Sequence, residues 1–230
     1  MASMQPPTMK ASSQPGIWQD HKKLFTRTYP TAQGQQVYNE HFRTQKGKEY
    51  RSWNPYRSKL AAALLKNIPP FNLTPTSHIL YLGAATGTTV SHLSDIASDG
   101  MIYAVECAPM AMTKFLQVTK TRSNIIPLHQ DASHPDRYRA FVPQVDLIYQ
   151  DIAQRQQADI FMNNFNTFAK PETQGILMVK ARSIDVSLSP QQAYNQVEHT
   201  LIENGFTVNA VKILTPYDKD HAVFLVQKKT

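Results

Sequence analysis

The fold of this 230-residue chain is decided by the stretch ILYLGAATGTTV, residues 79–90. Its first four residues are apolar and predict a buried strand, which Gly83 ends. Gly83 and Gly87 let the backbone turn tightly and approach a ligand. A helix that starts at Thr88 or Thr89 then offers free N–H groups to polar oxygens. A glycine loop between a strand and a helix predicts a site for a nucleotide-like cofactor. The strict G-x-G-x-x-G fingerprint and a P-loop lysine are absent from the sequence, which argues against a triphosphate.

Strand-like and helix-like segments alternate in the rest of the chain. The predicted strands and helices cover residues 78–82, 88–96, 101–106, 112–121, 124–128, 145–149, 159–168, 175–180 and 190–204. Such alternation predicts an α/β fold, with a Rossmann-like parallel sheet and helices on both of its faces. Two final strands, 206–213 and 222–227, follow one another without a helix and predict a hairpin at one edge of the sheet. This ending is typical of S-adenosylmethionine-dependent methyltransferases.

The chain divides into three parts. Residues 1–16, which are rich in proline, serine and glutamine, predict a disordered tail. Residues 17–53 predict a small antiparallel β domain, with alternating strand-like segments at 23–27, 36–39 and 48–51. Residues 54–230 are the predicted methyltransferase domain, which opens with a helix capped by Asn54 and Pro55. The apolar face of this helix carries Leu60, Leu64 and Ile68.

The charge of the chain suits a polyanionic partner, since the net charge is +7 and the pI is near 9.4. Basic and aromatic residues are interleaved in one short stretch, namely Arg43, Lys46, Lys48, Tyr50, Arg51, Trp53, Tyr56, Arg57 and Lys59. Such a mixture binds phosphates and stacks on bases. It fits a solvated hairpin face with half-buried aromatic residues equally well.

Other classes of protein are disfavoured by simple counts. No apolar run reaches the roughly 20 residues that span a bilayer, and the N-terminus has no apolar signal segment. Cys107 is the single cysteine, which excludes an internal disulfide and suits a reducing compartment.

Carboxylates follow successive predicted strands. Glu106 ends the second strand, where a carboxylate can accept bonds from both hydroxyls of a cofactor ribose. Asp131, followed by Ala132, ends the third and is placed to accept a bond from an adenine amino group. Taken singly, each acid also fits a helix cap or a solvated loop. Together with Asp151 after the fourth strand they favour S-adenosylmethionine over NAD, because cofactors bind at the carboxyl ends of strands in such sheets.

Four residues at strand and helix ends predict the chemistry. Asp151 and Lys180 end adjacent strands, whereas Lys59 lies in the first turn of a helix and His221 precedes the last strand. A ribose 2′-hydroxyl is a poor nucleophile, so a base must take its proton as the oxygen attacks a methyl group. A lysine does this when burial or a second ammonium lowers its pKa. We therefore predict methyl transfer to a ribose oxygen with Lys180 as the base. Lys59 is expected to poise this base, Asp151 to orient it, and His221 to position the hydroxyl or tune the pair of lysines.

The alternative for these four residues is that their roles are purely structural. It consists of two surface lysines with buried stems, a helix-capping aspartate and a structural histidine. The sequence offers no Cys/His metal cluster, and an activated sulfonium needs no metal.

Five longer stretches carry a family resemblance. They are YRSWNPYRSKLA (50–61), LYLGAATGTTVSH (80–92), DIAQ (151–154), KARSIDV (180–186) and PYDKDHA (216–222). In these motifs the chain resembles fibrillarin, the RNA 2′-O-methyltransferase of box C/D ribonucleoproteins. The similarity runs from about Val37 to the C-terminus, and the residues before Val37 match poorly.

The resemblance implies S-adenosyl-L-methionine as cofactor, a box C/D guide RNA that pairs with target rRNA or tRNA, a Nop-domain scaffold protein and a kink-turn-binding protein. The family's lysine–aspartate–lysine–histidine site falls on Lys59, Asp151, Lys180 and His221. The implied cofactor contacts are Gly83, Ala84, Thr88, Thr89, Glu106, Cys107, Asp131, Ala132, Asp151, Ile152, Ala153 and Gln154. The candidate RNA contacts are Arg51, Arg57 and Arg182, and neither a metal nor a membrane is expected.

Several positions depart from the family pattern. The chain lacks the Gly/Arg-rich extension of eukaryotic members and its motifs look archaeal, so a cytoplasmic location is expected, or a nucleolar one in a eukaryote. Cys107 stands where an aromatic residue usually packs beside the adenine, and Gln150 replaces a small apolar residue. Arg155 and Gln156 replace a typical Pro-Asp. Two alternatives follow: a stand-alone RNA methyltransferase, or a catalytically impaired structural subunit.

Overall fold

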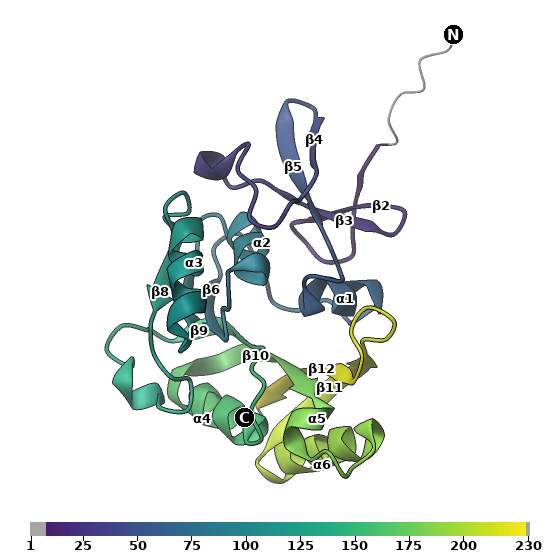
Figure 1. The fold of residues 1–230 in the computed structure, drawn as a ribbon, viewed down its shortest axis with the longest axis vertical. Helices are drawn as coiled ribbons and strands as arrows, with labels where there is room; N and C mark the ends of the chain where they lie inside the picture. The colour runs from purple at the N-terminus through teal and green to yellow at the C-terminus, as the bar shows by residue number, and fades with distance from the viewer. Residues whose placement is uncertain (1–7, 229–230) are drawn as a thin grey trace.

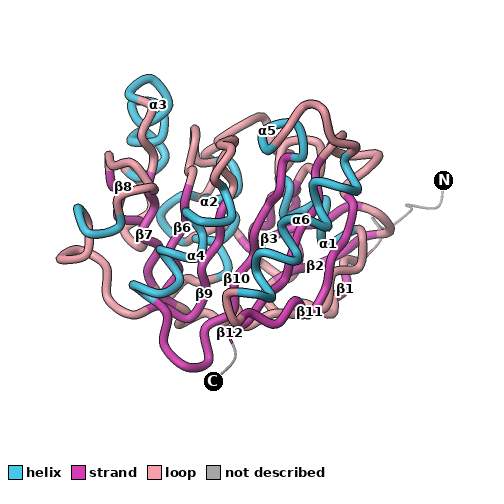
Figure 2. Tube along the Cα trace, turned by 90° about the horizontal axis from the view of Figure 1, so that it is seen from below, coloured by secondary structure: helices cyan, strands magenta, loops and turns pink. Residues whose placement is uncertain are grey.

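The structure, a computed structural model, describes residues 8–228 and contains two β-sheets (Figure 1). A five-stranded N-terminal sheet, in the order β1-β2-β3-β5-β4, lies above a seven-stranded sheet, in the order β11-β12-β10-β9-β6-β7-β8, in the view of Figure 1. Helices lie on both faces of the larger sheet (Figure 2). The predicted Rossmann-like methyltransferase fold, with a small antiparallel domain before it, is confirmed. Among the described residues, no helix has the length and apolarity to cross a membrane.

The N-terminal sheet is antiparallel and begins earlier than predicted. Its elements are β1 (Lys10–Ala11), β2 (Ile17–Asp20), β3 (Lys23–Arg27), the 3-10 helix η1 (Pro30–Ala32), β4 (Phe42–Gln45) and β5 (Lys48–Trp53). The predicted disordered tail is therefore wrong from residue 8 onward, and residues 1–7 lie outside the described residues. Buried Gln14 attaches this segment to the rest of the chain, because both ends of its amide bind the backbone of Phe71, at 3.1 and 2.9 Å.

The predicted strand at residues 36–39 is instead a loop. The buried carboxylate of Glu40 accepts hydrogen bonds from the backbone N–H groups of Val37, at 2.9 and 3.1 Å, and of Tyr38, at 2.7 Å. A side chain that binds these donors competes with a neighbouring strand for them. The segment therefore curls around Glu40.

The larger sheet has the predicted topology. Its strands are β6 (His78–Leu82), β7 (Met101–Val105), β8 (Ile125–Leu128), β9 (Val145–Gln150), β10 (Ala169–Lys180), β11 (Phe206–Ile213) and β12 (His221–Lys228). Strands β6 to β10 are parallel to one another, whereas β12 pairs antiparallel with β10 and β11. The predicted hairpin at the edge is confirmed. The carboxyl ends of five parallel strands consequently meet at one edge of the sheet.

The helices are α1 (Lys59–Leu65), α2 (Thr88–Ile96), α3 (Pro109–Thr119), the 3-10 helix η2 (Pro135–Arg137), α4 (Gln157–Phe168), α5 (Ala181–Ile184) and α6 (Pro190–Glu203). Helix α1 begins four residues later than Pro55 suggested. The Asn54 side chain accepts a bond from the Tyr56 N–H (2.9 Å) in a turn, and Ser58 caps the helix by accepting from the Ala61 N–H (3.4 Å). Lys59 is therefore the first helical residue, and Ile68 lies beyond the end of the helix.

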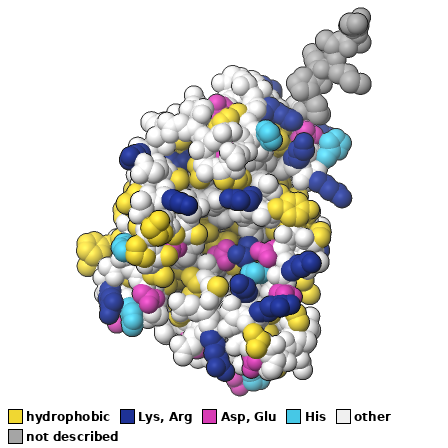
Figure 3. Space-filling view, in the orientation of Figure 1, with side chains coloured by type: hydrophobic (Ala, Val, Ile, Leu, Met, Phe, Trp, Pro, Cys, Tyr) yellow, Lys and Arg dark blue, Asp and Glu magenta, His cyan; other side chains and the backbone are white. Residues whose placement is uncertain are grey.

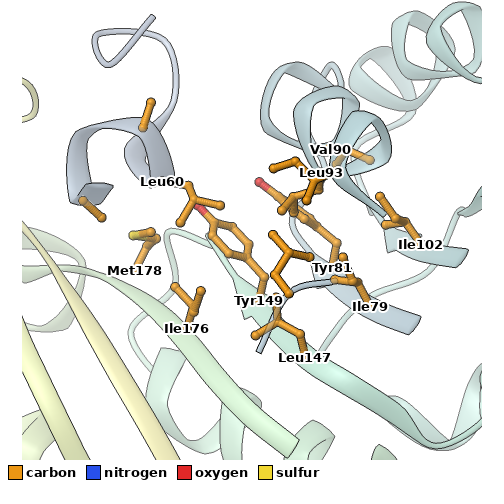
Figure 4. Close-up of a cluster of buried hydrophobic side chains, with 14 of the residues drawn as sticks. Leu60, Ile79, Tyr81, Val90, Leu93, Ile102, Leu147, Tyr149, Ile176 and Met178 are labelled. Atoms are coloured by element: carbon orange, nitrogen blue, oxygen red, sulfur yellow. The ribbon is translucent and has the colours of Figure 1, made fainter. Parts of the chain in front are cut away.

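The core fills both faces of the larger sheet. Along β6, Ile79 and Tyr81 face the layer that contains α1 and α2. Leu80 and Leu82 face the opposite layer, which contains α4. Figure 4 shows Tyr81 and Tyr149, from adjacent strands, pointing toward these helices. Their rings stack with centroids 4.5 Å apart. This packing holds α1, and with it Lys59, against the sheet.

A buried ion-pair network joins the two domains. Arg51 of β5 is fully buried, and its guanidinium donates to Asp95 of α2 (2.6 Å), to Glu40 and to the Ser91 hydroxyl (2.7 Å). Arg122 donates to the other oxygen of Asp95 (2.7 Å). Burial alone would lower the pKa of Arg51, but the carboxylates of Asp95 and Glu40 raise it above its ordinary value. The prediction that Arg51 contacts RNA is therefore wrong, because its charge is used inside the protein.

Candidate active site

The loops after β6 and β9 approach each other closely at the carboxyl edge of the sheet. Gly83, directly after β6, has a φ of +86°, and a Cβ built on it would lie 2.3 Å from the carbonyl oxygen of Asp151. The N–H of Asp151 donates to the Leu82 carbonyl (2.9 Å). Only glycine permits both this backbone angle and this approach. The glycine after β6 thus fixes the position of the carboxylate after β9.

A cleft of about 250 Å³ lies beside these loops. It is lined by Gly83, Ala85, Val105, Glu106, Cys107, Gln130, Asp131, Ala132, Asp151, Ile152, Ala153 and Gln154. The structure thus brings together all the predicted cofactor contacts except Ala84, Thr88 and Thr89. Thr89 is buried, with its hydroxyl 2.9 Å from that of Ser58, so it supports the cap of α1 instead. Ala85, Val105 and Gln130 also line the cleft and were not predicted, although each lies next to a predicted residue in the sequence.

The Glu106 carboxylate is oriented by two backbone groups. Its Oε2 accepts from the Ala85 N–H and its Oε1 from the Ala108 N–H, each at 2.7 Å. Each carboxylate oxygen can accept two hydrogen bonds. Both oxygens therefore keep one acceptor position for a ligand, a geometry that suits a pair of ribose hydroxyls.

The far wall of the cleft carries Asp131 and Cys107. The N–H and hydroxyl of Ser133 donate to Oδ1 of Asp131 (2.9 and 2.7 Å), and these bonds hold the pKa of Asp131 below its ordinary value. The pKa of Cys107 is raised, first by its partial burial and then by the carboxylates of Glu106 and Asp131. Cys107 consequently presents an uncharged thiol at neutral pH.

Three of the four predicted catalytic residues are linked by carboxylates. The Lys59 ammonium binds both oxygens of Asp151, at 2.9 and 3.0 Å, and lies 3.9 Å from Oδ2 of Asp218. Nδ1 of His221 lies 2.8 Å from Oδ1 of the same Asp218. Asp218 was not singled out in the sequence, although it lies in a motif only three residues before His221. Its position shows that the loop before β12 closes one side of the site.

Lys180, the fourth residue, stands apart from these ion pairs. It ends β10 directly opposite His221 of β12, so the two side chains leave the same face of the sheet. Asp151 was expected to orient Lys180, but both of its carboxylate oxygens bind Lys59 instead. Within residues 8–228, no hydrogen bond or ion pair of the Lys180 ammonium is found. Lys180 is thus the lysine of this site that no carboxylate neutralises.

Basic side chains surround the site. Figure 3 shows acidic, basic and histidine side chains gathered near the middle of one face, with further Lys and Arg side chains above them and to their right. Arg57 is exposed and lines a groove of about 430 Å³ with Lys114 and Thr86, beside the cofactor loop. Arg182 is 74% exposed, and its Nε lies 2.6 Å from Asp220. These two predicted RNA contacts, unlike Arg51, are accessible to a ligand.

A second groove, of about 610 Å³, adjoins the loop before β12. Tyr56 and Tyr217 meet there edge to face, with ring centroids 5.3 Å apart, and Tyr56 is 66% exposed. Lys22 and Lys23 also line it, and the described residues of its lining include no carboxylate. In the described part of the chain, no group of three or more His, Cys, Asp or Glu residues is arranged to hold a metal ion.

The family model for fibrillarin matches residues 10–230. The chain belongs to the fibrillarin family. The match also covers most of the N-terminal domain, where the sequence motifs had shown poor similarity before Val37. A fibrillarin-like rRNA/tRNA 2′-O-methyltransferase of Thermococcus onnurineus is 44% identical to the chain over 196 residues, which are 85% of this chain and 86% of the relative.

Two solved structures of fibrillarins are similar along nearly the whole chain. Aeropyrum pernix fibrillarin, in complex with natively bound S-adenosyl-L-methionine, is 39% identical and superimposes with a TM-score of 0.86, covering 96% of this chain and 98% of its own. The fibrillarin of a fibrillarin/Nop5p complex is 39% identical, with a TM-score of 0.85, covering 94% of this chain and 99% of its own.

Proposed function

We propose that this chain transfers a methyl group from S-adenosylmethionine to ribose 2′-oxygens of rRNA or tRNA, as the catalytic subunit of a guide-directed box C/D ribonucleoprotein. The observation that carries the proposal is the double role of Asp151. Asp151 lines the cleft, and its carboxylate binds Lys59 through both oxygens, which supports a catalytic site beside the cleft. The relative named a rRNA/tRNA 2′-O-methyltransferase and the S-adenosylmethionine bound to A. pernix fibrillarin support the reaction and the cofactor.

The cleft fits this cofactor. Glu106 has an acceptor position on each oxygen for the ribose hydroxyls, and neither Ser133 bond uses Oδ2 of Asp131, which suits an adenine amino group. Gly83 leaves open the space that a Cβ would fill. When bound, S-adenosylmethionine supplies a methyl group on a sulfonium centre, whose sulfur leaves as a neutral thioether.

Lys180 is the proposed general base. The 2′-oxygen forms its new bond to the methyl carbon while the hydroxyl proton passes to Nζ of a neutral Lys180. Lys59 is a poorer candidate, because its ammonium is already bound by both oxygens of Asp151, at 2.9 and 3.0 Å. In this account Lys59 and Asp151 hold the loop after β9 in place, and Lys180 moves the proton.

His221 is proposed to position the substrate hydroxyl. Its Nδ1 lies 2.7 Å from the Lys219 carbonyl oxygen and 2.8 Å from Oδ1 of Asp218. Both partners are acceptors, so Nδ1 is the donor to them and Nε2 remains for the substrate. A ribose hydroxyl that donates to Nε2 would lie over the face of the sheet from which Lys180 also projects.

The two grooves beside the site are proposed to bind the RNA. In an A-form duplex the 2′-hydroxyls line the wide, shallow minor groove, so the enzyme must approach the paired target from that side. Arg57 and Lys114 are available for phosphates beside the cofactor loop, and Arg182 is available beside the loop before β12, where it pairs with Asp220. On the other flank, Tyr56 projects from the groove that also holds Lys22 and Lys23.

The proposed particle also contains proteins and a guide. The fibrillarin/Nop5p complex supports a Nop-domain scaffold as a partner of this chain. A guide RNA and a kink-turn-binding protein complete the proposal. The archaeal sources of the relatives support a cytoplasmic location.

Methyl transfer from labelled S-adenosylmethionine to RNA tests the proposal. The chain is assayed alone and with scaffold, kink-turn protein and guide, and the modified nucleotide is mapped by mass spectrometry. A second guide, paired one nucleotide further along the target, should move the methyl group by one position. Labelling by the chain alone would favour a stand-alone enzyme, and cofactor binding without labelling would favour a structural subunit.

A further inference from the structure

The last residue of β10 lacks a strand neighbour on one side. Strands β9 and β10 pair in register only as far as Gln150 and Leu177. Beyond Gln150 the chain leaves the sheet to line the cofactor cleft, whereas β10 continues to Lys180. The backbone N–H and C=O of Lys180 would therefore be without partners on this side, and unpaired backbone groups in the interior are costly.

The side chain of Gln157, the first residue of α4, occupies the place of the missing strand. Its Oε1 accepts from the Lys180 N–H at 3.1 Å, and its Nε2 donates to the Lys180 carbonyl at 3.2 Å. Gln157 is fully buried, and its own carbonyl accepts from Nε2 of Gln150 at 2.6 Å. One amide thus satisfies both backbone groups of Lys180, and the end of β9 in turn holds the residue that carries the amide.

This arrangement also determines what faces Lys180 on its other side. Since both backbone groups of Lys180 point toward Gln157, its pairing with His221 is of the kind without direct backbone bonds, in which opposed side chains lie closer together. The amide of Gln157 therefore sets both the position of the Lys180 backbone and its spacing from the histidine.

We propose that Gln157 is a positioning residue for methyl transfer, which fixes the base Lys180 by replacing the strand that β9 does not provide. The inference rests on the proposed role of Lys180. Lys180 reaches the substrate through a flexible four-carbon stem, so its reach depends on a fixed backbone. A displacement of about 1 Å in such a group costs about 100-fold in rate.

The chain contains a matched control. Gln14 is also buried and also binds one backbone residue through both ends of its amide, in this case Phe71, at 3.1 and 2.9 Å. It lies in the N-terminal domain and does not line the cleft. Gln157→Leu and Gln14→Leu therefore each remove one pair of amide–backbone hydrogen bonds. The pair of Gln157 lies inside the site, and the pair of Gln14 lies outside it.

The experiment compares these variants in the complete particle, under single-turnover conditions and below the unfolding temperature of both. We expect the methylation rate of Gln157→Leu to fall about 10- to 100-fold, with the apparent affinities for S-adenosylmethionine and RNA within about twofold of wild type. Gln14→Leu should lower Tm to a similar extent and keep the rate. Gln157→Glu retains the acceptor but lacks the donor, and we expect an intermediate rate. A Gln157→Leu rate within about twofold of that of Gln14→Leu would overturn the proposal.

A second readout needs no cofactor and no catalysis. Hydrogen exchange of the Lys180 amide, followed by NMR on the purified chain, should accelerate in Gln157→Leu and stay unchanged in Gln14→Leu. Unchanged protection in Gln157→Leu would contradict the inference whether or not the particle is active. If protection is lost but wild type transfers no methyl group, the failure belongs to the proposed function, whereas the positioning of Lys180 by Gln157 stands.

Discussion

Replacement of Arg51 by methionine should destabilise the fold without weakening RNA binding directly. Removing one partner of a buried ion pair costs about 3–5 kcal/mol, because the other charge is left uncompensated. Here Asp95 keeps its bonds from Arg122 (2.7 Å) and from the Thr26 hydroxyl (2.6 Å), and Glu40 keeps those from the backbone N–H groups of its own loop. The lower end of the range, about 3 kcal/mol, is therefore expected for Arg51→Met. For a chain of this length about 2–4 °C of Tm corresponds to each kcal/mol, so Tm should fall by roughly 6–12 °C.

Urea and thermal unfolding measure this cost, and Arg57→Met is the matched control. Arg57 is exposed, so its replacement should change the free energy of unfolding by less than about 0.5 kcal/mol. In the proposed RNA interface, Arg57→Met should instead weaken RNA binding and reduce the slope of log affinity against log salt by about 0.9, the value for one phosphate contact. An Arg51→Met variant that unfolds like wild type, or that lowers the salt slope of RNA binding with unchanged stability, would refute the structural role of Arg51.

Three further predictions concern a histidine, a glycine and the cysteine. The pKa of buried His92 is held well below 6.5, by burial and then by nearby arginines, so its contribution to stability is complete above about pH 6.5 and is lost below it by about 1.4 kcal/mol per pH unit. Equal Tm values one unit above and one unit below pH 6.5 would contradict this. Gly83→Ala should displace the Asp151 carbonyl oxygen, because the new Cβ would lie 2.3 Å from it. We expect the methylation rate to fall by about 100-fold. A rate near wild type in a folded variant would show that the loop tolerates the shift. Cys107→Phe should lower the Kd for S-adenosylmethionine about 2- to 10-fold by stacking of the ring, and calorimetry that finds no change would remove the argument that the thiol weakens the site.

The sequence was a good guide where structure depends on local patterns. The alternation of strands and helices predicted the larger sheet and its terminal hairpin. The helix predicted at residues 190–204 is α6, which starts with a capping box formed by Ser189 and Gln192. The glycine loop and the acids after the strands predicted most of the cleft, because strand ends in a parallel sheet meet at one edge.

Errors arose where a side chain is used by a distant part of the chain. Arg51 lies among basic and aromatic residues and gives no local sign of burial, since its partner Asp95 is far away in the sequence. The error at 36–39 has a local cause, since the segment alternates like a strand but the neighbouring Glu40 binds its N–H groups. Asp218 and Gln157 were missed for the same reason as Arg51, because each acts on a residue that only the fold brings near.

The central claim is that Lys180 accepts the proton of the ribose hydroxyl. The most direct test is the single-turnover methylation rate of Lys180→Ala in the complete particle, measured beside Lys120→Ala, which removes an exposed lysine at the end of α3. Loss of a general base predicts a fall of about 10²- to 10⁴-fold for Lys180→Ala, with S-adenosylmethionine still bound and with Lys120→Ala unaffected. A Lys180→Ala particle that methylates its target at the rate of Lys120→Ala would contradict the account.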